Sequence, residues 1–463
     1  MVVEGRLSGA GISIPSEGSF LSCFQKRNTI IKYHDILSVE RDVPGCTQVR
    51  YLCRSSKPYR VRRRTLRIRT SSDMDLEELA DPTSESLLPS QEMPRNSTQS
   101  TNDEVDIVNR YIEQRAFAHH DLTKRNHTAL VIINPHSGKN KAERLYNELA
   151  APVFAACGFK TAVMVTKYAG EAKKVAHELD AKNFCCIICV SGDGLIHEVL
   201  NGLTSRSDSS DALNRLPLAQ LPGGSGNALS LSLNHGETEW GALALGIAKG
   251  SGDLIDLMAI TQKDTIYYSF LSQTFGIVAG CDVGTEHLRW MGPMRFRYGI
   301  VTRCLSKHKY PCKIEYVPGS AATDDEQADI VNPNLKPLKT INDEFDPNAV
   351  VEVHKNLSMF YVGKTKWMAG DALVFPLAKP LDGCMDMMVW DTDIGSINAL
   401  RMLIKFETGA HVNHVPFYKK VSSYRLTPLN DEPHLSIDGE AYPPEPFQVD
   451  VIPRGARFIT PNY

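Results

Sequence analysis

Three stretches of the chain repeat one pattern, an apolar strand followed by a Gly-rich turn and an amphipathic helix. They are TALVIINP with HSGKNKAERLYNELAAPVFAAC, FKTAVMVT with AGEAKKVAHELDA, and FCCIICV with SGDGLIHEVLNGL. Strands that alternate with helices favour a parallel sheet, and ligands of such sheets bind at the carboxyl ends of the strands. Every Gly-rich turn here falls at such an end. We therefore predict an α/β domain over residues 126–251 with its site at this sheet edge.

The residue pattern on either side of this domain differs from the pattern within it. Residues 1–70 alternate apolar and polar residues in short runs, which predicts a small β-rich module, and residues 71–125 form an acidic, Ser-rich linker and a lead-in helix. After residue 252, strand-like runs such as TIYYSFL and MDMMVW predict an antiparallel second domain over 252–463. A polar stretch at about 318–348 indicates a long insertion between two strands, and its length favours disorder.

Charge and hydropathy narrow the function further. The chain of 463 residues has a formal net charge of -3, which gives no global reason to bind nucleic acid. It lacks a signal-peptide pattern and any run near the roughly 20 apolar residues that span a bilayer, so we expect a cytoplasmic protein. The arginines of YRVRRRTLRIRT fit either peripheral contact with an anionic intracellular membrane or a solvated strand face. Cys186 and Cys189 have CxxC spacing within an apolar strand, and we interpret them as core residues rather than metal ligands.

The turns themselves carry the chemistry of a phosphate site. Asn134-Pro135-His136 opens a helix whose N-terminus presents N–H groups to an anion, although the GxxxxGK[ST] loop is absent. In SGDG, glycines let a phosphate approach the backbone, while Asp193 could accept a proton from a hydroxyl or help hold a metal. The run LPGGSGN adds three glycines and a hydroxyl as another anion cradle.

The runs LVIINPHSGKNKA, SGDGLIHEVLNG and LPGGSGNALSLSLNH closely resemble the diacylglycerol kinase catalytic domain, and most nearly that of sphingosine (sphingoid long-chain base) kinases. The resemblance extends from about residue 128 to the C-terminus. It implies an α/β nucleotide-binding domain and an antiparallel β-sandwich lipid-binding domain, with ATP in the cleft between them. The implied reaction is phosphorylation of the primary hydroxyl of sphingosine, dihydrosphingosine or phytosphingosine, with Mg²⁺ neutralising the phosphates. A ceramide or diacylglycerol kinase, or a catalytically silent lipid-binding scaffold, is the alternative.

The resemblance also assigns roles to single residues. It makes Asp193 the general base, with the other residues of Ser191-Gly192-Asp193-Gly194 beside the substrate. Asp282 matches the acid that pairs with the lipid amine, although the family often has two acids in a segment where this chain keeps one. The implied nucleotide contacts are Asn134, Pro135, His136, Thr166, Lys167, Tyr168, Ala169, Gly170, Gly224, Ser225, Gly226, Arg289, Arg295 and the motif Asp438-Gly439-Glu440, with Glu198 as a support.

Overall fold

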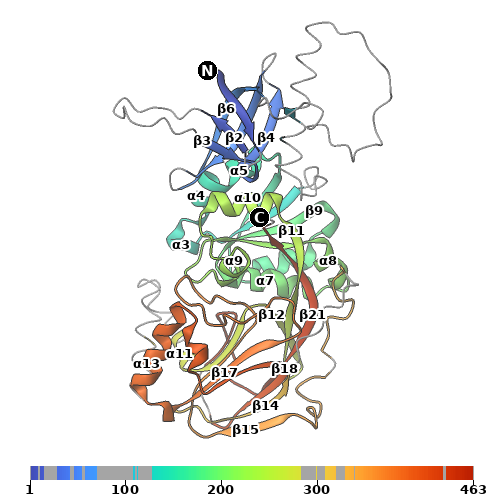
Figure 1. The fold of residues 1–463 in the computed structure, drawn as a ribbon. Coiled ribbons are helices and arrows are strands. Elements are labelled where there is room, and N and C mark those ends of the chain that lie inside the picture. Colours follow the sequence, from blue (N-terminus) through green and yellow to red (C-terminus); the bar gives the residue numbers. More distant parts are fainter. Residues whose placement is uncertain are drawn as a thin grey trace.

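An α/β unit lies at the centre of the molecule, between a small sheet near the N-terminus and a larger antiparallel region (Figure 1). The structure is a computed structural model. It describes residues 2–8, 11–14, 29–41, 46–54, 58–69, 108–109, 112, 128–282, 299, 308–319, 329–337, 339–430 and 434–461.

The α/β unit is built on four parallel strands in the order β10-β9-β7-β8. They are β7 (Thr128–Ile133), β8 (Lys160–Val165), β9 (Phe184–Ser191) and β10 (Leu218–Pro222). On β7, Leu130 and Ile132 join one hydrophobic cluster, whereas Val131 and Ile133 join another on the opposite face. This two-sided burial is expected of a parallel sheet that helices cover on both faces.

Short helices follow the strands as the sequence pattern predicts. Their bounds are α3 (Ser137–Asn140), α4 (Ala142–Leu145), a π-helical turn (Tyr146–Ala150), α5 (Ala151–Ala156), α6 (Glu171–Glu178), α7 (Asp193–Thr204), α8 (Ser209–Arg215), α9 (Ala228–Leu233) and α10 (Trp240–Lys249). Helix α7 begins at Asp193, within the Gly-rich turn that follows β9, and α9 begins directly after the Gly-rich turn that follows β10. Their N-termini therefore lie at the sheet edge where the phosphate site is predicted.

The second region is antiparallel, and it confirms the predicted fold class. Its elements are β11 (Ser251–Gln262), β12 (Thr265–Ser269), β13 (Ser272–Gly276), α11 (Ile277–Asp282), β14 (Cys312–Pro318), β15 (Val350–His354), β16 (Leu357–Gly363), β17 (Met385–Asp391), α13 (Ser396–Ile404), β18 (Phe417–Pro428), β19 (Leu435–Ile437), β20 (Glu440–Tyr442) and β21 (Phe447–Thr460). Its own core includes Met258, Phe275, Phe360 and Tyr424, each from a different strand.

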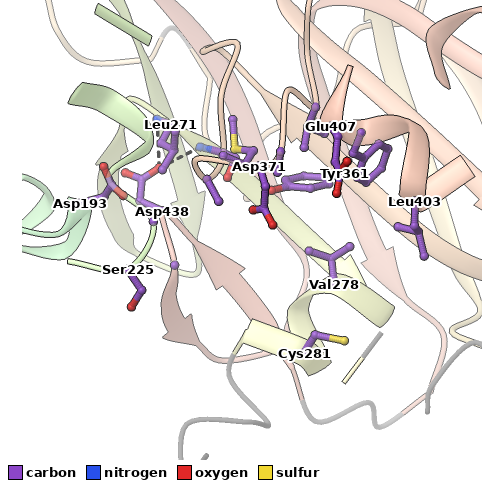
Figure 2. A pocket seen from close by; sticks show the side chains of 18 of the residues that line it. Asp193, Ser225, Leu271, Val278, Cys281, Tyr361, Asp371, Leu403, Glu407 and Asp438 are labelled. Atoms are coloured by element: carbon purple, nitrogen blue, oxygen red, sulfur yellow. Dashed lines mark hydrogen bonds between the residues drawn. The ribbon is translucent and has the colours of Figure 1, made fainter. Parts of the chain in front are cut away.

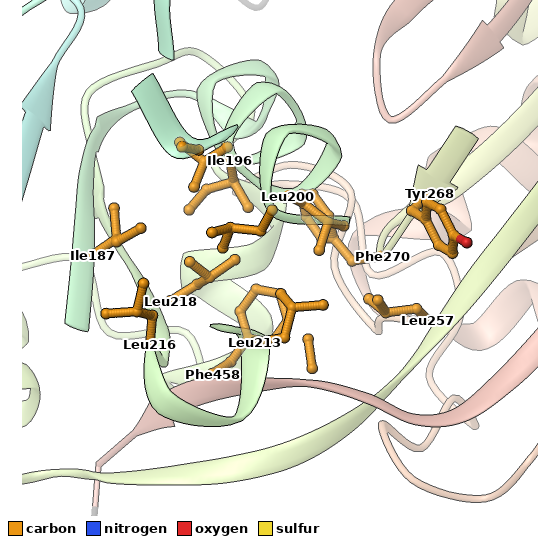
Figure 3. Close-up of a cluster of buried hydrophobic side chains, with 14 of the residues drawn as sticks. Ile187, Ile196, Leu200, Leu213, Leu216, Leu218, Leu257, Tyr268, Phe270 and Phe458 are labelled. Carbon is orange, nitrogen blue, oxygen red and sulfur yellow. The ribbon is translucent and has the colours of Figure 1, made fainter. Parts of the chain in front are cut away.

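The two regions share both a sheet and a core. Strand β21 runs parallel to β10, where Phe458 is opposite Leu218, and antiparallel to β11 along most of its length. In the cluster drawn in Figure 3, Leu200 from α7 packs with Leu257 and Phe270 from the second region. The sheet and its apolar core are thus continuous across the predicted boundary at residue 251.

The N-terminal module is a six-stranded sheet in the order β3-β2-β1-β6-β5-β4. Its strands are β1 (Val2–Ser8), β2 (Gly11–Ile14), β3 (Thr29–Lys32), β4 (Ile36–Arg41), β5 (Thr47–Cys53) and β6 (Arg60–Arg69). Leu37 and Leu52 belong to the same buried cluster as Trp240, and Lys249 Nζ donates a hydrogen bond to the carbonyl of His34 at 3.1 Å. The module therefore packs against α10. Among the helices of the described residues, none has the length and apolarity to cross a membrane.

The described residues of the segment after β14 make tertiary contacts, and the disorder of this insertion stays a prediction. Val331 and Leu335 are 2% and 5% exposed, and they pack into the core of the α/β unit. Arg425 donates hydrogen bonds to the carbonyls of Thr340 and Asp343. The segment is irregular in backbone but is anchored by tertiary contacts, which composition alone does not reveal.

Candidate active site

A cavity of about 470 Å³ opens where the α/β unit meets the antiparallel region (Figure 2). Its polar end contains Asp193, Ser225, Gly226 and the 438–440 turn. Its other walls are mostly apolar and include Val278, Cys281, Tyr361, Met368, Val374, Leu400, Leu403, Ile404 and Phe406. The volume lies within the range of small-molecule sites, and the division suits an amphiphile with a polar head and an alkyl chain.

Asp193 is held at this polar end by three donors. Its Oδ2 accepts a hydrogen bond from Ala228 N at 3.0 Å, while its Oδ1 accepts from Leu229 N at 3.1 Å and Gln220 Nε2 at 3.3 Å. A carboxylate oxygen offers two acceptor positions, so Oδ2 keeps one for a further partner. Burial raises the pKa of Asp193 above its ordinary value, although the three hydrogen bonds oppose that rise. The group is thus oriented and retains an acceptor position.

The two glycine turns touch each other beside Asp193. A Cβ on Gly224 would lie 2.5 Å from the Cα of Gly192, so the turn does not admit a side chain at position 224. The second turn is fastened by Asn227, whose Oδ1 accepts from Gly224 N at 2.8 Å and whose backbone is left-handed, with φ 54°. The hydroxyls of Ser137 and Ser191 lie 2.9 Å apart and link the turn after β7 to the turn after β9. The sequence pattern predicts these turns at one sheet edge, and in the structure they are in contact.

The other predicted nucleotide residues form a second patch at the same edge. Asn134 Oδ1 accepts a hydrogen bond from His136 N at 3.0 Å, which shapes the turn before α3. Thr166 is buried, and its Oγ1 donates to the carbonyl of Ile133, so its hydroxyl faces the backbone. Glu198 Oε2 accepts from Gly170 N at 3.0 Å. Glu198 therefore fixes the turn of residues 166–170.

Asp438 has its carboxylate occupied by protein groups. Its Oδ1 accepts from Ser269 Oγ and from the backbone N–H groups of Leu271 and Ser272, and its Oδ2 accepts from His197 Nδ1 at 2.9 Å. The side chain is 0% exposed. This arrangement leaves the carboxylate of Asp438 little room for the nucleotide contact that the resemblance implies. Its carboxylate instead joins α7 to the antiparallel region.

His197 was missed by the sequence reasoning. Because its Nδ1 faces a carboxylate, we assign the proton to Nδ1, and Nε2 then accepts from Tyr442 OH at 2.7 Å. Asn201, one turn further on, donates to the carbonyl of Tyr268 at 2.8 Å. A histidine and an asparagine four residues apart on an apolar helix face, in LIHEVLNGL, were the only local signal.

Glu440 sits over the N-terminus of α7. A Cβ on Gly194 would overlap Glu440 Oε1, so the carboxylate reaches this point because residue 194 is glycine. The positive end of a helix dipole favours a carboxylate there. Asp193 and Glu440 thus face the same cavity from opposite sides of the domain junction.

The residues of the cavity could hold Mg²⁺ together with the phosphates of a bound nucleotide. The described part of the chain has no group of three or more His, Cys, Asp or Glu side chains that would hold a metal by itself. Mg²⁺ is, however, commonly held by one or two carboxylates together with substrate phosphates. Glu440, which lines the cavity beside the glycine turns, matches that mode.

Three predicted residues lie outside this description. Arg289 and Arg295 belong to residues that the structure does not describe, and so does the side chain of Asp282. The backbone of Asp282 ends α11, the helix from which Val278 and Cys281 line the cavity.

The fold and site define a class of protein. Residues 128–260 match the model of the diacylglycerol kinase catalytic domain. A structure from Bacillus anthracis, described as a diacylglycerol kinase, aligns with a TM-score of 0.51 at 19% sequence identity and covers 72% of this chain and 97% of that one. At this identity the likeness concerns the fold. The catalytic-domain match, together with the glycine turns around Asp193, makes the protein a lipid kinase.

Similar sequences narrow the class. Sphingoid long chain base kinase 4 of Schizosaccharomyces pombe is 35% identical over 350 residues, which cover 73% of this chain and 76% of the relative. Sphingoid long chain base kinase 5 of Saccharomyces cerevisiae is 31% identical over 79% of this chain but 63% of its own length. Sphingosine kinase 1 of Homo sapiens is 26% identical over 70% of this chain and 88% of its own. The chain belongs to the sphingoid long-chain base kinase family.

Proposed function

We propose that the protein transfers the γ-phosphoryl group of ATP to the primary hydroxyl of a sphingoid long-chain base such as sphingosine, dihydrosphingosine or phytosphingosine. The observation that carries this proposal is the position of Asp193, at the point where an apolar cavity meets the glycine turns. A lipid whose chain fills the apolar end would bring its head to this carboxylate. ATP phosphates would lie against the backbone of the turns at 191–194 and 224–226.

The chemistry follows from the free acceptor position on Asp193 Oδ2. This oxygen takes the hydroxyl proton as the hydroxyl oxygen bonds to the γ-phosphorus, and the bond from that phosphorus to the β–γ bridging oxygen breaks. The products are the base 1-phosphate, ADP and a proton on Asp193. Mg²⁺, which the phosphates and Glu440 would hold, would neutralise the charge on the transferred group. Arg289 and Arg295 are proposed to supply further positive charge to the phosphates.

Substrate selection is proposed to depend on Asp282. A carboxylate near the lipid head favours a protonated amine over the amide of ceramide or the glycerol of diacylglycerol, because an unpaired buried acid is costly. An Asp282→Asn variant should raise KM for sphingosine far more than KM for ATP. An unchanged preference among sphingosine, ceramide and diacylglycerol would contradict this role.

Asp193→Asn tests the reaction itself. The amide cannot accept the proton but keeps the size of the side chain, so phosphate transfer should fall by about a hundredfold or more while the fold persists. The measurement is transfer of labelled phosphate from ATP to sphingosine, ceramide and diacylglycerol. Asp211→Asn, an exposed carboxylate on α8, is the matched control and should match the wild type. Full activity of Asp193→Asn would refute the assignment.

A further inference from the structure

Helix α13 exposes a stripe of three large apolar side chains. Ile397, Leu400 and Ile404 are 71%, 38% and 62% exposed. Their spacing of three and four residues places them along one face of the helix. The helix does not need these residues to hold it in place, because Ala399 and Met402 on its other face are buried in the core.

The stripe continues into the cavity. Leu400 and Ile404 line the cavity together with Leu403, although both are also exposed to solvent. Figure 2 shows Leu403 on one side of the cavity and Asp193 on the other. Apolar side chains therefore lead from the outside of α13 into the cavity that contains Asp193, and Asp371 and Glu407 are the acidic residues on its other walls.

Charge on the helix favours a lipid surface as the partner. Arg401 is exposed one turn after Ile397, and Lys405 directly follows the helix and is partly exposed. Apolar side chains flanked by cations are typical of helices that lie in the interface of a bilayer. A stripe of three residues is also small for a stable contact between proteins, which usually involves about 20–30 residues on each side.

We propose that this face of α13 is the surface with which the protein lies on a lipid bilayer while it takes up its substrate. This inference rests on the proposed function, in which the substrate is a lipid. Its alkyl chain would pass from the bilayer along Ile397, Leu400 and Ile404 into the cavity without crossing water. The stripe thus serves as a lipid entrance as well as an anchor.

Ile397→Asp tests the proposal, because Ile397 is the most exposed of the three and does not line the cavity. An aspartate in the first turn of α13 is compatible with the helix. With sphingosine in vesicles of phosphatidylcholine and phosphatidylserine, we expect binding to vesicles to weaken and KM to rise, each by about tenfold or more. With a short-chain, water-soluble sphingoid base, kcat and KM should equal those of the wild type.

Two further variants keep the result interpretable. Ile330→Asp changes a residue that is 55% exposed on another part of the molecule, and it should bind vesicles like the wild type. Ile397→Leu keeps the apolar side chain and should do the same. Normal vesicle binding and normal KM in Ile397→Asp would overturn the proposal, as would a change of oligomeric state with vesicle binding retained. If the wild type phosphorylates neither sphingosine in vesicles nor the soluble base, the proposed function fails instead.

Discussion

Asp193 combines two opposing influences on one carboxylate. Burial raises its pKa, while hydrogen bonds from Leu229, Ala228 and Gln220 lower it and leave the pKa above the ordinary value for an aspartate. As the proposed base, Asp193 must be ionised, so activity should increase as the pH rises through its pKa. The acid limb of the pH profile should accordingly lie above about 3.9, the usual aspartate value.

Gln220→Glu should move this limb to higher pH. The glutamate keeps the acceptor that Gln220 Oε1 offers to Ser230 N, but it replaces the donor to Asp193 with a like charge. Two facing carboxylates favour one shared proton, which raises the pKa of the second ionisation of the pair. The measurement is kcat/KM against pH for variant and wild type with the same substrate. An acid limb at the same or lower pH in the variant would exclude Gln220 from the control of Asp193.

At the scale of elements, helix α7 contains two glycines, one near each end, that have different structural roles. Gly194 makes room for the carboxylate of Glu440, the end of a side chain that can swing away. Gly202 instead faces the backbone carbonyl of Lys173 on α6, which cannot move without displacing that helix. One glycine therefore serves the site, and the other serves helix packing.

Alanine at each position should separate the two effects. Gly194→Ala should push Glu440 off the N-terminus of α7, lowering kcat about tenfold or more with little change in Tm. Gly202→Ala should lower stability by about 1–3 kcal/mol, because its methyl group would overpack the contact between α6 and α7. Thermal unfolding and kcat measured on both variants test this. The prediction fails if Gly194→Ala loses as much stability as Gly202→Ala.

Local patterns account for what the sequence could predict at this scale. The strand, turn and helix order around Asp193 depends on neighbours in the chain, so it was predictable. The hydrogen bond from His197 to Asp438 joins residues 241 positions apart, and Gln220 reaches Asp193 from another strand. Such partners depend on which strands become neighbours in the sheet, and the order of strands in a sheet cannot be predicted from local patterns in one sequence. The burial of Val331 and Leu335 was unpredictable for the same reason.

At the scale of the whole molecule, a buried charge cluster stabilises the antiparallel region. Lys364 Nζ lies 2.8 Å from Asp256 and 2.7 Å from Asp382, and Lys420 Nζ bridges Asp382 and Asp386. Lys364 is 1% exposed. Burial alone would raise the pKa of Asp382, but hydrogen bonds from the two lysines hold it below its ordinary value. Its contribution to stability is therefore present above about pH 4 and is lost as the pH falls through the lowered pKa.

Lys364→Met should be strongly destabilising. Among the residues that the structure describes, Lys364 is the cation paired with Asp256 and one of two paired with Asp382. Removing one partner of a buried ion pair typically costs about 3–5 kcal/mol. Lys263→Met breaks the exposed pair with Glu445 and should cost about 0–1 kcal/mol. Urea unfolding of both variants near neutral pH gives the comparison. Equal losses in the two variants would show that the buried cluster contributes no more than a surface pair.

The α/β unit cannot complete its sheet during synthesis until the strand β21 has been made. It is the last strand of the described chain, yet it pairs with β10 of the α/β unit as well as with β11 and β18. Domains usually fold in sequence as they leave the ribosome. Here β10 keeps an open edge until β21 has been translated, and open edges invite pairing with other chains. Nascent chains of this enzyme should therefore depend on chaperones until β21 has left the ribosome and paired with β10.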